Sequence, residues 1–313
     1  MVHVLTPQWL PHPSKTDPLE HSMSPRWELV SLTTEDGLRL RGLFMPPQEG
    51  RTVVHVHGNS GNFYENTFLD SMANEYAKAG LGFLTFNNRG HDVIAEAYRS
   101  GKLCYIGAAV EHYLESVLDL QAAINFANQY SAFTFLQGHS FGCLKVLHFL
   151  LRSHQTINSI LLSPADTLQL QKNFIRPETL ENQIARLKHS LGSHTDLLLP
   201  HGEFGIREGE SDYTIPIMAR TFLELFEGDF SRVLSYTSPM QYYVDGAVFV
   251  YRGGSDPLLT ASRQEIEHYF AARFRTVFLC NEEIGDHHMH RVEEKVAAQI
   301  AMWVAQTSAA AGK

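Results

Sequence analysis

Short apolar runs alternate with helical stretches along most of the chain. Residues 52–57 (TVVHVH) and 81–86 (LGFLTF) predict buried strands, and residues 68–79 predict a helix between them. Four further elements continue the alternation: a helix at 106–130, a strand at 132–137, a helix at 141–153 and a strand at 157–163. Apolar strands separated by helices are typical of parallel pairing. The pattern therefore predicts an α/β fold, with a mostly parallel central sheet flanked by helices.

The beginning of the chain follows a different pattern. Residues 1–26 contain five prolines and show neither a helical nor a strand period, so we expect an extended N-terminal arm. From Trp27 the apolar period becomes two residues, and Asp36-Gly37 separates two such runs. An Asp-Gly pair in this setting predicts a β-hairpin.

A long insertion interrupts the alternation. Apolar residues at helical spacing run from Leu180 to Leu191, before the helix terminator Gly192, and a second helix is expected to start at Pro216. Residues 167–245 are too many for an ordinary loop and predict an inserted helical cap. The alternation then returns with strands at 247–253 and 275–281 and helices near 262–272 and 292–303. We therefore expect one core domain formed by residues 27–166 and 246–313.

Composition narrows the possible partners and the compartment. Of 313 residues, 19% are charged, against roughly 25% in an average domain, which suits a large core. The net charge of -9 and the lack of a basic run argue against a nucleic-acid partner. We expect no membrane span, because no apolar run approaches ~20 residues. The N-terminus lacks a secretory signal pattern, so a cytoplasmic location is expected.

The three cysteines, Cys104, Cys143 and Cys280, form no C-x-x-C pair. They are too few and too scattered for a disulfide framework or a zinc ribbon. We expect reduced, mostly buried thiols.

The motif Gly138-His139-Ser140-Phe141-Gly142 joins a predicted strand to a predicted helix. Side chains at the two glycines would crowd a turn that exposes the Ser140 hydroxyl above the sheet. The following helix would direct its N-terminal N–H groups toward an oxyanion formed there. Ser140 is therefore a candidate nucleophile.

A serine nucleophile needs an imidazole base and an acid that orients the imidazole. Asp256 follows the strand at 247–253, and His287 follows the strand at 275–281. Because the carboxyl ends of parallel strands lie at one sheet edge, we expect Ser140, Asp256 and His287 to converge there.

These features resemble the α/β-hydrolase fold superfamily. The resemblance rests on GHSFG, on the order Ser140, Asp256, His287, on His57-Gly58 at a strand end and on NNRGHD at 87–92. It covers residues 27–306 apart from the cap, and it implies an oxyanion hole from the backbone N–H groups of Phe141 and Asn59. NNRGHD departs from the usual pattern at Asn87 and Asp92, where relatives often have Asp and Gly.

Other residues could fill two of these roles. Asp166 also follows a strand and is the alternative acid, while His288 and His290 are alternative bases beside His287. We favour Asp256, and we favour His287 because relatives often show Gly, then Asp-His, then an apolar residue two places later. We expect His139, with His55 and His57, to pack beside the sheet.

The sequence predicts a serine hydrolase that cleaves a small-molecule ester or thioester, with an apolar group, through an acyl-enzyme on Ser140. The same intermediate could instead pass its acyl group to a non-water acceptor, as in an acyltransferase or cyclising thioesterase. Two alternatives come from other classes. His55 and His57, two apart on a strand, could belong to a metal-dependent hydrolase, although no matching ligand set is evident; an inactive binding protein is the other. No cofactor is implied, and the sequence does not indicate an oligomeric state.

Overall fold

The computed structural model describes residues 26–192, 194, 196–200, 202–208, 211–237 and 239–311. The predicted arm at residues 1–26 therefore lies outside the described residues, apart from Arg26. No helix in the described part of the chain combines the length and the apolar character that crossing a bilayer requires. Cys143 and Cys280 are buried, Cys104 is partly buried, and all three thiols are free.

Eight strands form one central sheet in the order β1-β2-β4-β3-β7-β8-β11-β12. Their bounds are β1 Glu28–Thr33, β2 Arg39–Met45, β3 Arg51–Val56, β4 Gly82–Phe86, β7 Phe133–His139, β8 Ser159–Leu162, β11 Val244–Gly253 and β12 Phe274–Glu282. β2 is antiparallel to both of its neighbours, and the other strand pairs of this sheet are parallel. The predicted mostly parallel sheet is confirmed, and so is the hairpin that turns at Asp36-Gly37.

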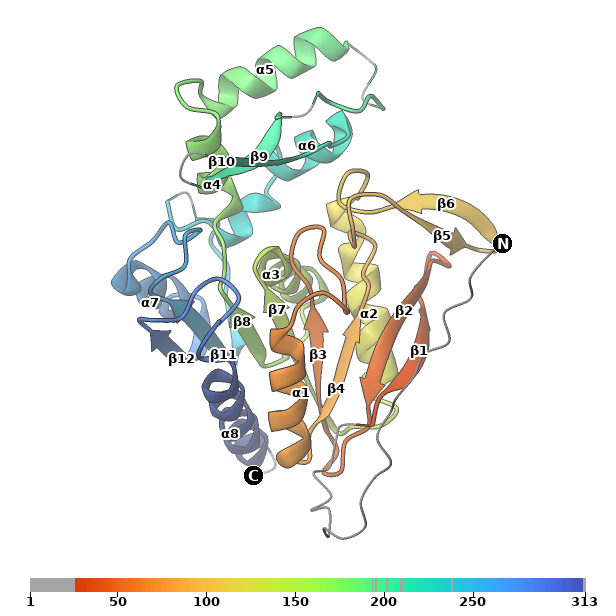
Figure 1. Cartoon of the computed structure of the whole chain (residues 1–313), viewed down its shortest axis with the longest axis vertical. Helices are drawn as coiled ribbons and strands as arrows, with labels where there is room; N and C mark the ends of the chain where they lie inside the picture. Colours follow the sequence, from red (N-terminus) through yellow and green to blue (C-terminus); the bar gives the residue numbers. More distant parts are fainter. Residues whose placement is uncertain are drawn as a thin grey trace, which may run out of the picture.

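Helices cover both faces of this sheet (Figure 1). Their bounds are α1 Phe68–Lys78 and α8 Glu293–Ala311 on one face, and α2 Ser116–Ala127, α3 Phe141–Ser153 and α7 Arg263–Ala271 on the other. Successive residues of a strand point to opposite faces. Val53 accordingly joins the core beneath α1 and α8, whereas Val54 joins the core beneath α2 and α3. Burial on both faces explains why the sequence shows continuous apolar runs.

The stretch between β4 and β7 differs from the sequence prediction. Instead of one helix over 106–130, it contains the antiparallel strands β5 Ala95–Arg99 and β6 Lys102–Ile106, a 3₁₀ turn at Tyr113–Glu115 and then α2. Gly107 ends β6 with φ 117°, and a Cβ there would lie 2.6 Å from the carbonyl oxygen of Val93. The prediction was wrong over 106–115, because apolar periodicity does not register such a backbone break.

The insertion between β8 and β11 lies over the carboxyl ends of the parallel strands (Figure 1). It contains the helices α4 Thr167–Phe174, α5 Leu180–Leu191 and α6 Ala219–Phe226, a 3₁₀ turn at Ser231–Leu234, and the antiparallel strands β9 Phe204–Glu208 and β10 Ser211–Ile215. We call this segment the cap. α5 ends at Gly192 as predicted. The β9/β10 pair was not predicted, since two five-residue strands contain too few periods to be told from loop sequence.

A buried ion cluster anchors the loop after β4 to α2. Arg89, with a side chain only 2% exposed, donates from Nε and Nη2 to Asp119 Oδ1 at 3.0 and 2.8 Å. The backbone N–H of Arg89 donates to the other oxygen of Asp119 at 2.7 Å. Burial opposes the charge of Arg89, but Asp119, Asp36 and Glu115 outweigh that effect and raise its pKa. The guanidinium therefore stays charged inside the protein.

Removing a carboxylate partner of the buried Arg89 should destabilise the folded protein. We expect Asp119→Ala to lower the free energy of unfolding by about 3–5 kcal/mol, because it leaves a buried cation without its main partner. Urea denaturation would measure this change. Asp245→Ala is the matched control, since Asp245 and its partner Arg275 are 64% and 61% exposed, and it should change stability little. Equal losses in the two variants would contradict the role assigned to Asp119.

Two histidines of the core are held neutral by burial. Burial lowers the pKa of His55 on β3 to about 3, and burial with the nearby Arg152 lowers the pKa of His148 on α3 to about 4. In an unfolded chain a histidine has a pKa of ~6.5. Below that pH these histidines bind protons in the unfolded chain but stay neutral in the folded protein. The free energy of unfolding therefore has its full value above pH ~6.5 and decreases as the pH falls below it.

The His148→Leu variant should weaken this pH dependence. Wild-type protein should lose stability between pH 6.5 and 4.5, and the variant should lose up to about 1.4 kcal/mol less per pH unit, because one proton fewer is linked to unfolding. Urea midpoints measured across this pH range would test the expectation. Parallel pH profiles for the two proteins would contradict it.

Candidate active site

Ser140 occupies a strained turn between β7 and α3. Its φ and ψ are 54° and −121°, in a region that non-glycine residues rarely adopt. A Cβ on Gly138 would lie 2.6 Å from the Cys143 nitrogen, and a Cβ on Gly142 would lie 2.2 Å from the carbonyl oxygen of Val56. Both glycines are therefore required by close backbone contacts, as the sequence predicted, and Ser140 lines a cavity above the sheet.

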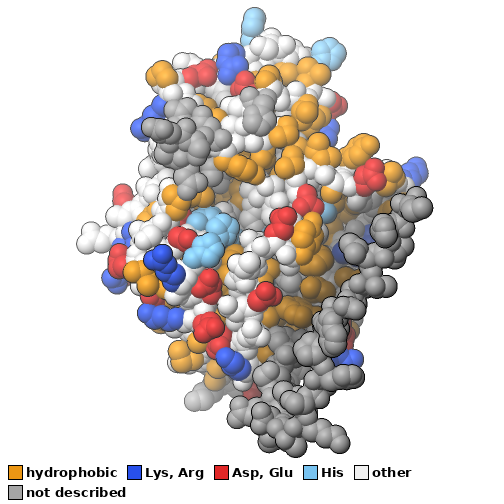
Figure 2. Space-filling model, viewed as in Figure 1, with side chains coloured by type: hydrophobic (Ala, Val, Ile, Leu, Met, Phe, Trp, Pro, Cys, Tyr) orange, Lys and Arg blue, Asp and Glu red, His pale blue; other side chains and the backbone are white. Residues whose placement is uncertain are grey.

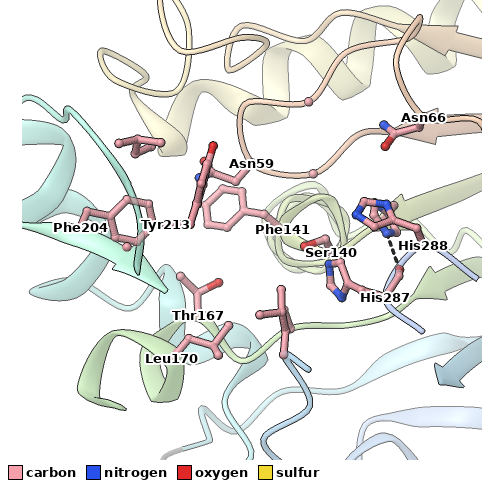
Figure 3. Close-up of a pocket in the computed structure, with 17 residues that line it drawn as sticks. Asn59, Asn66, Ser140, Phe141, Thr167, Leu170, Phe204, Tyr213, His287 and His288 are labelled. Carbon is pink, nitrogen blue, oxygen red and sulfur yellow. Dashed lines mark hydrogen bonds between the residues drawn. The ribbon is translucent and has the colours of Figure 1, made fainter. Parts of the chain in front are cut away.

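His287 and Asp256 meet at the same edge, after β12 and β11. His287 Nδ1 lies 2.9 Å from Asp256 Oδ2, and both residues are more than nine-tenths buried. The other carboxylate oxygen of Asp256 accepts the backbone N–H of Leu258 at 2.8 Å. With Nδ1 turned to the carboxylate, Nε2 is the ring nitrogen left to face the cavity, where His287 lies beside Ser140 (Figure 3).

The sequence did not anticipate how the His287 loop is held. His139 Nε2 and Ser163 Oγ both donate to the backbone carbonyl of His287, at 2.9 and 2.8 Å. Burial holds the pKa of His139 well below its usual value, so the ring is neutral and donates through Nε2–H. His139 comes directly before Ser140 and Ser163 directly after β8, so position at a strand end was the available signal.

The alternative residues lie elsewhere in the hydrogen-bond network. Asp166 caps α4, accepting from the backbone N–H of Gln169 at 2.9 Å, and it also accepts from the backbone N–H of Tyr236 at 2.8 Å. His290 pairs with Asp286 at 2.7 Å. The ring of His288 lies 5.3 Å from that of His287 and lines the cavity. Of these candidates, the structure therefore brings only His287 into contact with a predicted acid, Asp256.

The two residues of the predicted oxyanion hole, Phe141 and Asn59, line the same cavity as Ser140. Phe141 is the first residue of α3, and Asn59 follows Gly58, where a Cβ would lie 3.2 Å from that of Ser140. His57 steadies this loop: its Nδ1 donates to the Gly58 carbonyl at 2.9 Å, and its Nε2 accepts the Asn88 N–H at 3.2 Å. Burial, with the nearby charge of Lys145, holds the pKa of His57 well below its usual value. The ring is therefore neutral, as these two hydrogen bonds require.

The cavity has a volume of about 250 Å³ and lies between the sheet edge and the cap. The cap contributes a largely apolar wall of Leu170, Phe204, Tyr213 and Ile215, together with Thr167 (Figure 3). Figure 2 shows histidine side chains gathered on this face of the molecule, with hydrophobic side chains of the cap above them. The residues that line the cavity thus come from segments far apart in sequence.

Among the described residues, His55 on β3 and His57, directly after β3, do not form part of a ligand set. His55 Nδ1 lies 2.8 Å from Gln137 Nε2, and His57 makes the two contacts described above. Within the described ranges, no three His, Cys, Asp or Glu side chains gather as ligands for a metal ion. The part of the chain that the structure describes therefore gives the metal-dependent alternative no donor set.

No protein-family model matches the sequence, and no curated protein sequence matches it. Solved structures do match. A carboxyl esterase from Bacillus coagulans has a TM-score of 0.63 at 13% identity, covering 90% of this chain and 98% of that one. Est1E from Butyrivibrio proteoclasticus, solved with ferulic acid bound, has a TM-score of 0.59 at 16% identity, covering 90% and 99%. The esterase Pf2001 of Pyrococcus furiosus has a TM-score of 0.57 at 16% identity, covering 95% and 99%.

These similarities extend over nearly the full length of each chain, so they concern the whole architecture rather than one motif. They agree with the mostly parallel central sheet and its flanking helices described above. The chain has the α/β-hydrolase fold.

Proposed function

We propose that this protein is a serine hydrolase that cleaves an ester through an acyl-enzyme on Ser140. The observation that carries the proposal is the position of His287, hydrogen-bonded to Asp256 at 2.9 Å on one side and lining the same cavity as Ser140 on the other. This arrangement suits a general base whose tautomer is fixed by a carboxylate. Solved esterases of the same fold are consistent with ester hydrolysis.

The proposed reaction has two halves. The Ser140 hydroxyl gives its proton to His287 Nε2 as its oxygen bonds to the ester carbonyl carbon. The bond from that carbon to the alcohol oxygen then breaks, and His287 returns the proton to the departing alcohol. Water repeats the sequence on the acyl-enzyme, which releases the acid and restores Ser140.

Charge that develops on the carbonyl oxygen needs fixed donors. We assign this role to the N–H groups of Phe141 and Asn59, and the N-terminal end of α3 adds a favourable dipole. The hydrogen bonds of His57 to the Gly58 carbonyl and the Asn88 N–H hold the Asn59 loop in place before substrate binds. Donors that are already oriented need no rearrangement during the reaction.

The cap supports an apolar group in the substrate. Leu170, Phe204 and Ile215 present hydrocarbon and an aromatic ring to the cavity. Burying one CH₂ group is worth ~0.8 kcal/mol. We therefore propose that the ester carries an apolar acyl group large enough to reach the cap.

Removing the nucleophile or the base should abolish turnover. We expect Ser140→Ala and His287→Ala each to lower kcat for a nitrophenyl ester by about 10⁴–10⁶, or ~5–8 kcal/mol at the transition state. The double variant should be little worse than either single one, because the residues act as a unit. Steady-state kinetics would measure the losses, and mass spectrometry of protein treated with a phosphonate should find the adduct on Ser140.

His290→Ala is the matched control, because this exposed histidine belongs to the same loop and pairs with Asp286. It should retain most of the activity. If His287→Ala kept near-normal kcat while His288→Ala lost it, the assignment of the base would be wrong.

Lengthening the acyl chain should raise kcat/KM until the cavity is full. With a constant alcohol, each added methylene should give up to about a fourfold increase, which corresponds to ~0.8 kcal/mol. Leu170→Trp should end this rise at a shorter chain, since Leu170 lines the cavity and a larger side chain there would fill part of it. Leu197→Trp, at a cap position 51% exposed, is the control. Equal kcat/KM for acetate and longer esters in the wild-type protein would contradict an apolar acyl site.

A further inference from the structure

The cavity has two unlike sides around Ser140. In Figure 3, Phe204, Tyr213 and Leu170 of the cap lie on one side of Ser140, and Asn66 and His288 lie on the other. Side chains separated in one view are at least that far apart in space. A substrate whose carbonyl carbon sits at Ser140 must therefore direct its two arms toward different chemical surroundings.

The chemistry of the proposed reaction decides which arm goes where. The departing alcohol oxygen must receive its proton from His287 Nε2, so the alcohol leaves on the His287 side. The ring of His288 lies 5.3 Å from the ring of His287 and belongs to that side. The acyl group must extend away from His287, toward the cap.

We propose that His288 and Asn66 bind the alcohol part of the substrate, and that the substrate is an ester of an apolar acid with a hydroxyl-rich alcohol. This inference rests on the proposed function. It gives His288 a role in binding the leaving group rather than as the base.

His288 has the hydrogen-bonding capacity that this role needs. Its backbone N–H donates to Asp286, but within the described residues neither ring nitrogen has a hydrogen-bond partner. Its ring packs beside those of His139 and Phe68. Burial lowers the pKa of His288, so the neutral ring offers one donor and one acceptor.

Asn66 complements His288 on the same side of the cavity. Its Nδ2 donates to the Asn62 carbonyl at 3.4 Å, which leaves its Oδ1 as an acceptor on the cavity wall. None of the described lining residues is Lys, Arg, Asp or Glu. Neutral donors and acceptors suit hydroxyl groups, whereas a phosphate or carboxylate on the alcohol would find no counter-charge there.

The opposite side is lined by residues of the β9/β10 pair of the cap. Tyr213 of β10 lies with its hydroxyl 3.3 Å from Ser60 Oγ, in the loop that also carries Asn59. This contact holds the aromatic wall of Tyr213 and Phe204 close to the acyl side of Ser140. An apolar acyl group would bury its surface against these rings.

The test separates the two arms with matched esters. Hexanoic acid is presented as the ethyl ester and as the glyceryl ester, and acetic acid is presented as the same two esters. For the wild-type protein we expect kcat/KM to be higher for glyceryl hexanoate than for ethyl hexanoate, and higher for either hexanoate than for the matching acetate.

Variants then assign each preference to a side. His288→Ala and Asn66→Ala should each reduce the glyceryl-over-ethyl preference by about fivefold or more, and leave the hexanoate-over-acetate preference within twofold. Phe204→Leu keeps an apolar side chain but removes the aromatic ring. It should reduce the hexanoate-over-acetate preference and leave the glyceryl-over-ethyl preference within twofold. His290→Ala and Tyr105→Ala are controls, since both residues are exposed and neither lines the cavity.

Deacylation gives an independent readout. The acyl-enzyme has already lost its alcohol, so its rate of hydrolysis should change in Phe204→Leu and stay near the wild-type rate in His288→Ala. If His288→Ala slows deacylation as much as acylation, His288 serves the base and this inference is overturned. This inference is also overturned if Ser140-dependent turnover persists but each variant changes both preferences equally. Loss of all Ser140-dependent turnover in the wild-type protein would instead overturn the proposed function, and this inference with it.

Discussion

The arrangement of the site depends on the close contact between the first turn of α3 and strand β3. A Cβ at Gly142 would stand 2.2 Å from the carbonyl oxygen of Val56, so only glycine allows α3 to start this near the sheet. That contact forces Ser140 into its positive-φ conformation and directs its side chain into the cavity. It also brings the N-terminal N–H groups of α3 beside the loop that carries Asn59. The proposed nucleophile and the proposed oxyanion donors therefore share one structural cause.

The backbone carbonyl of His287 links the loop after β12 to the ends of β7 and β8. It accepts hydrogen bonds from His139, next to Ser140, and from Ser163, at the end of β8. The ring of the same residue binds Asp256 after β11. Main chain and side chain of His287 are thus fixed by different strands, which restricts where its free nitrogen can point. This restriction favours the proposed role of His287 as proton acceptor, because the ring loses little conformational freedom when substrate binds.

The cap has more influence on the chemical character of the cavity than on where the cavity lies. Strand ends alone would place Ser140, Asp256 and His287 at an open edge. The cap adds Phe204 and Tyr213 on one side only, while the opposite side keeps the polar groups of the loops. The proposed positioning of an ester by both of its arms depends on this asymmetry. The asymmetry arises from a short strand pair that has no strong sequence signal.

The sequence by itself determined the alternation of buried strands and helices, and with it the parallel sheet and the positions of Ser140, Asp256 and His287 at strand ends. These features follow from the local spacing of apolar residues and from glycines that relieve close contacts in tight turns. Both signals can be read from a single sequence. It did not record the β5/β6 pair, where Gly107 breaks an apolar pattern that resembled a helix.

Only the tertiary structure decided which histidine meets Asp256. Asp286 accepts the N–H groups of His288 and His290, and Met289 is buried, so the loop turns His287 inward and leaves His290 outside. Asp166 likewise caps α4 instead of meeting a histidine. The contacts that His287 makes with Asp256, His139 and Ser163 join residues distant in sequence, and local patterns carry no information about those partners.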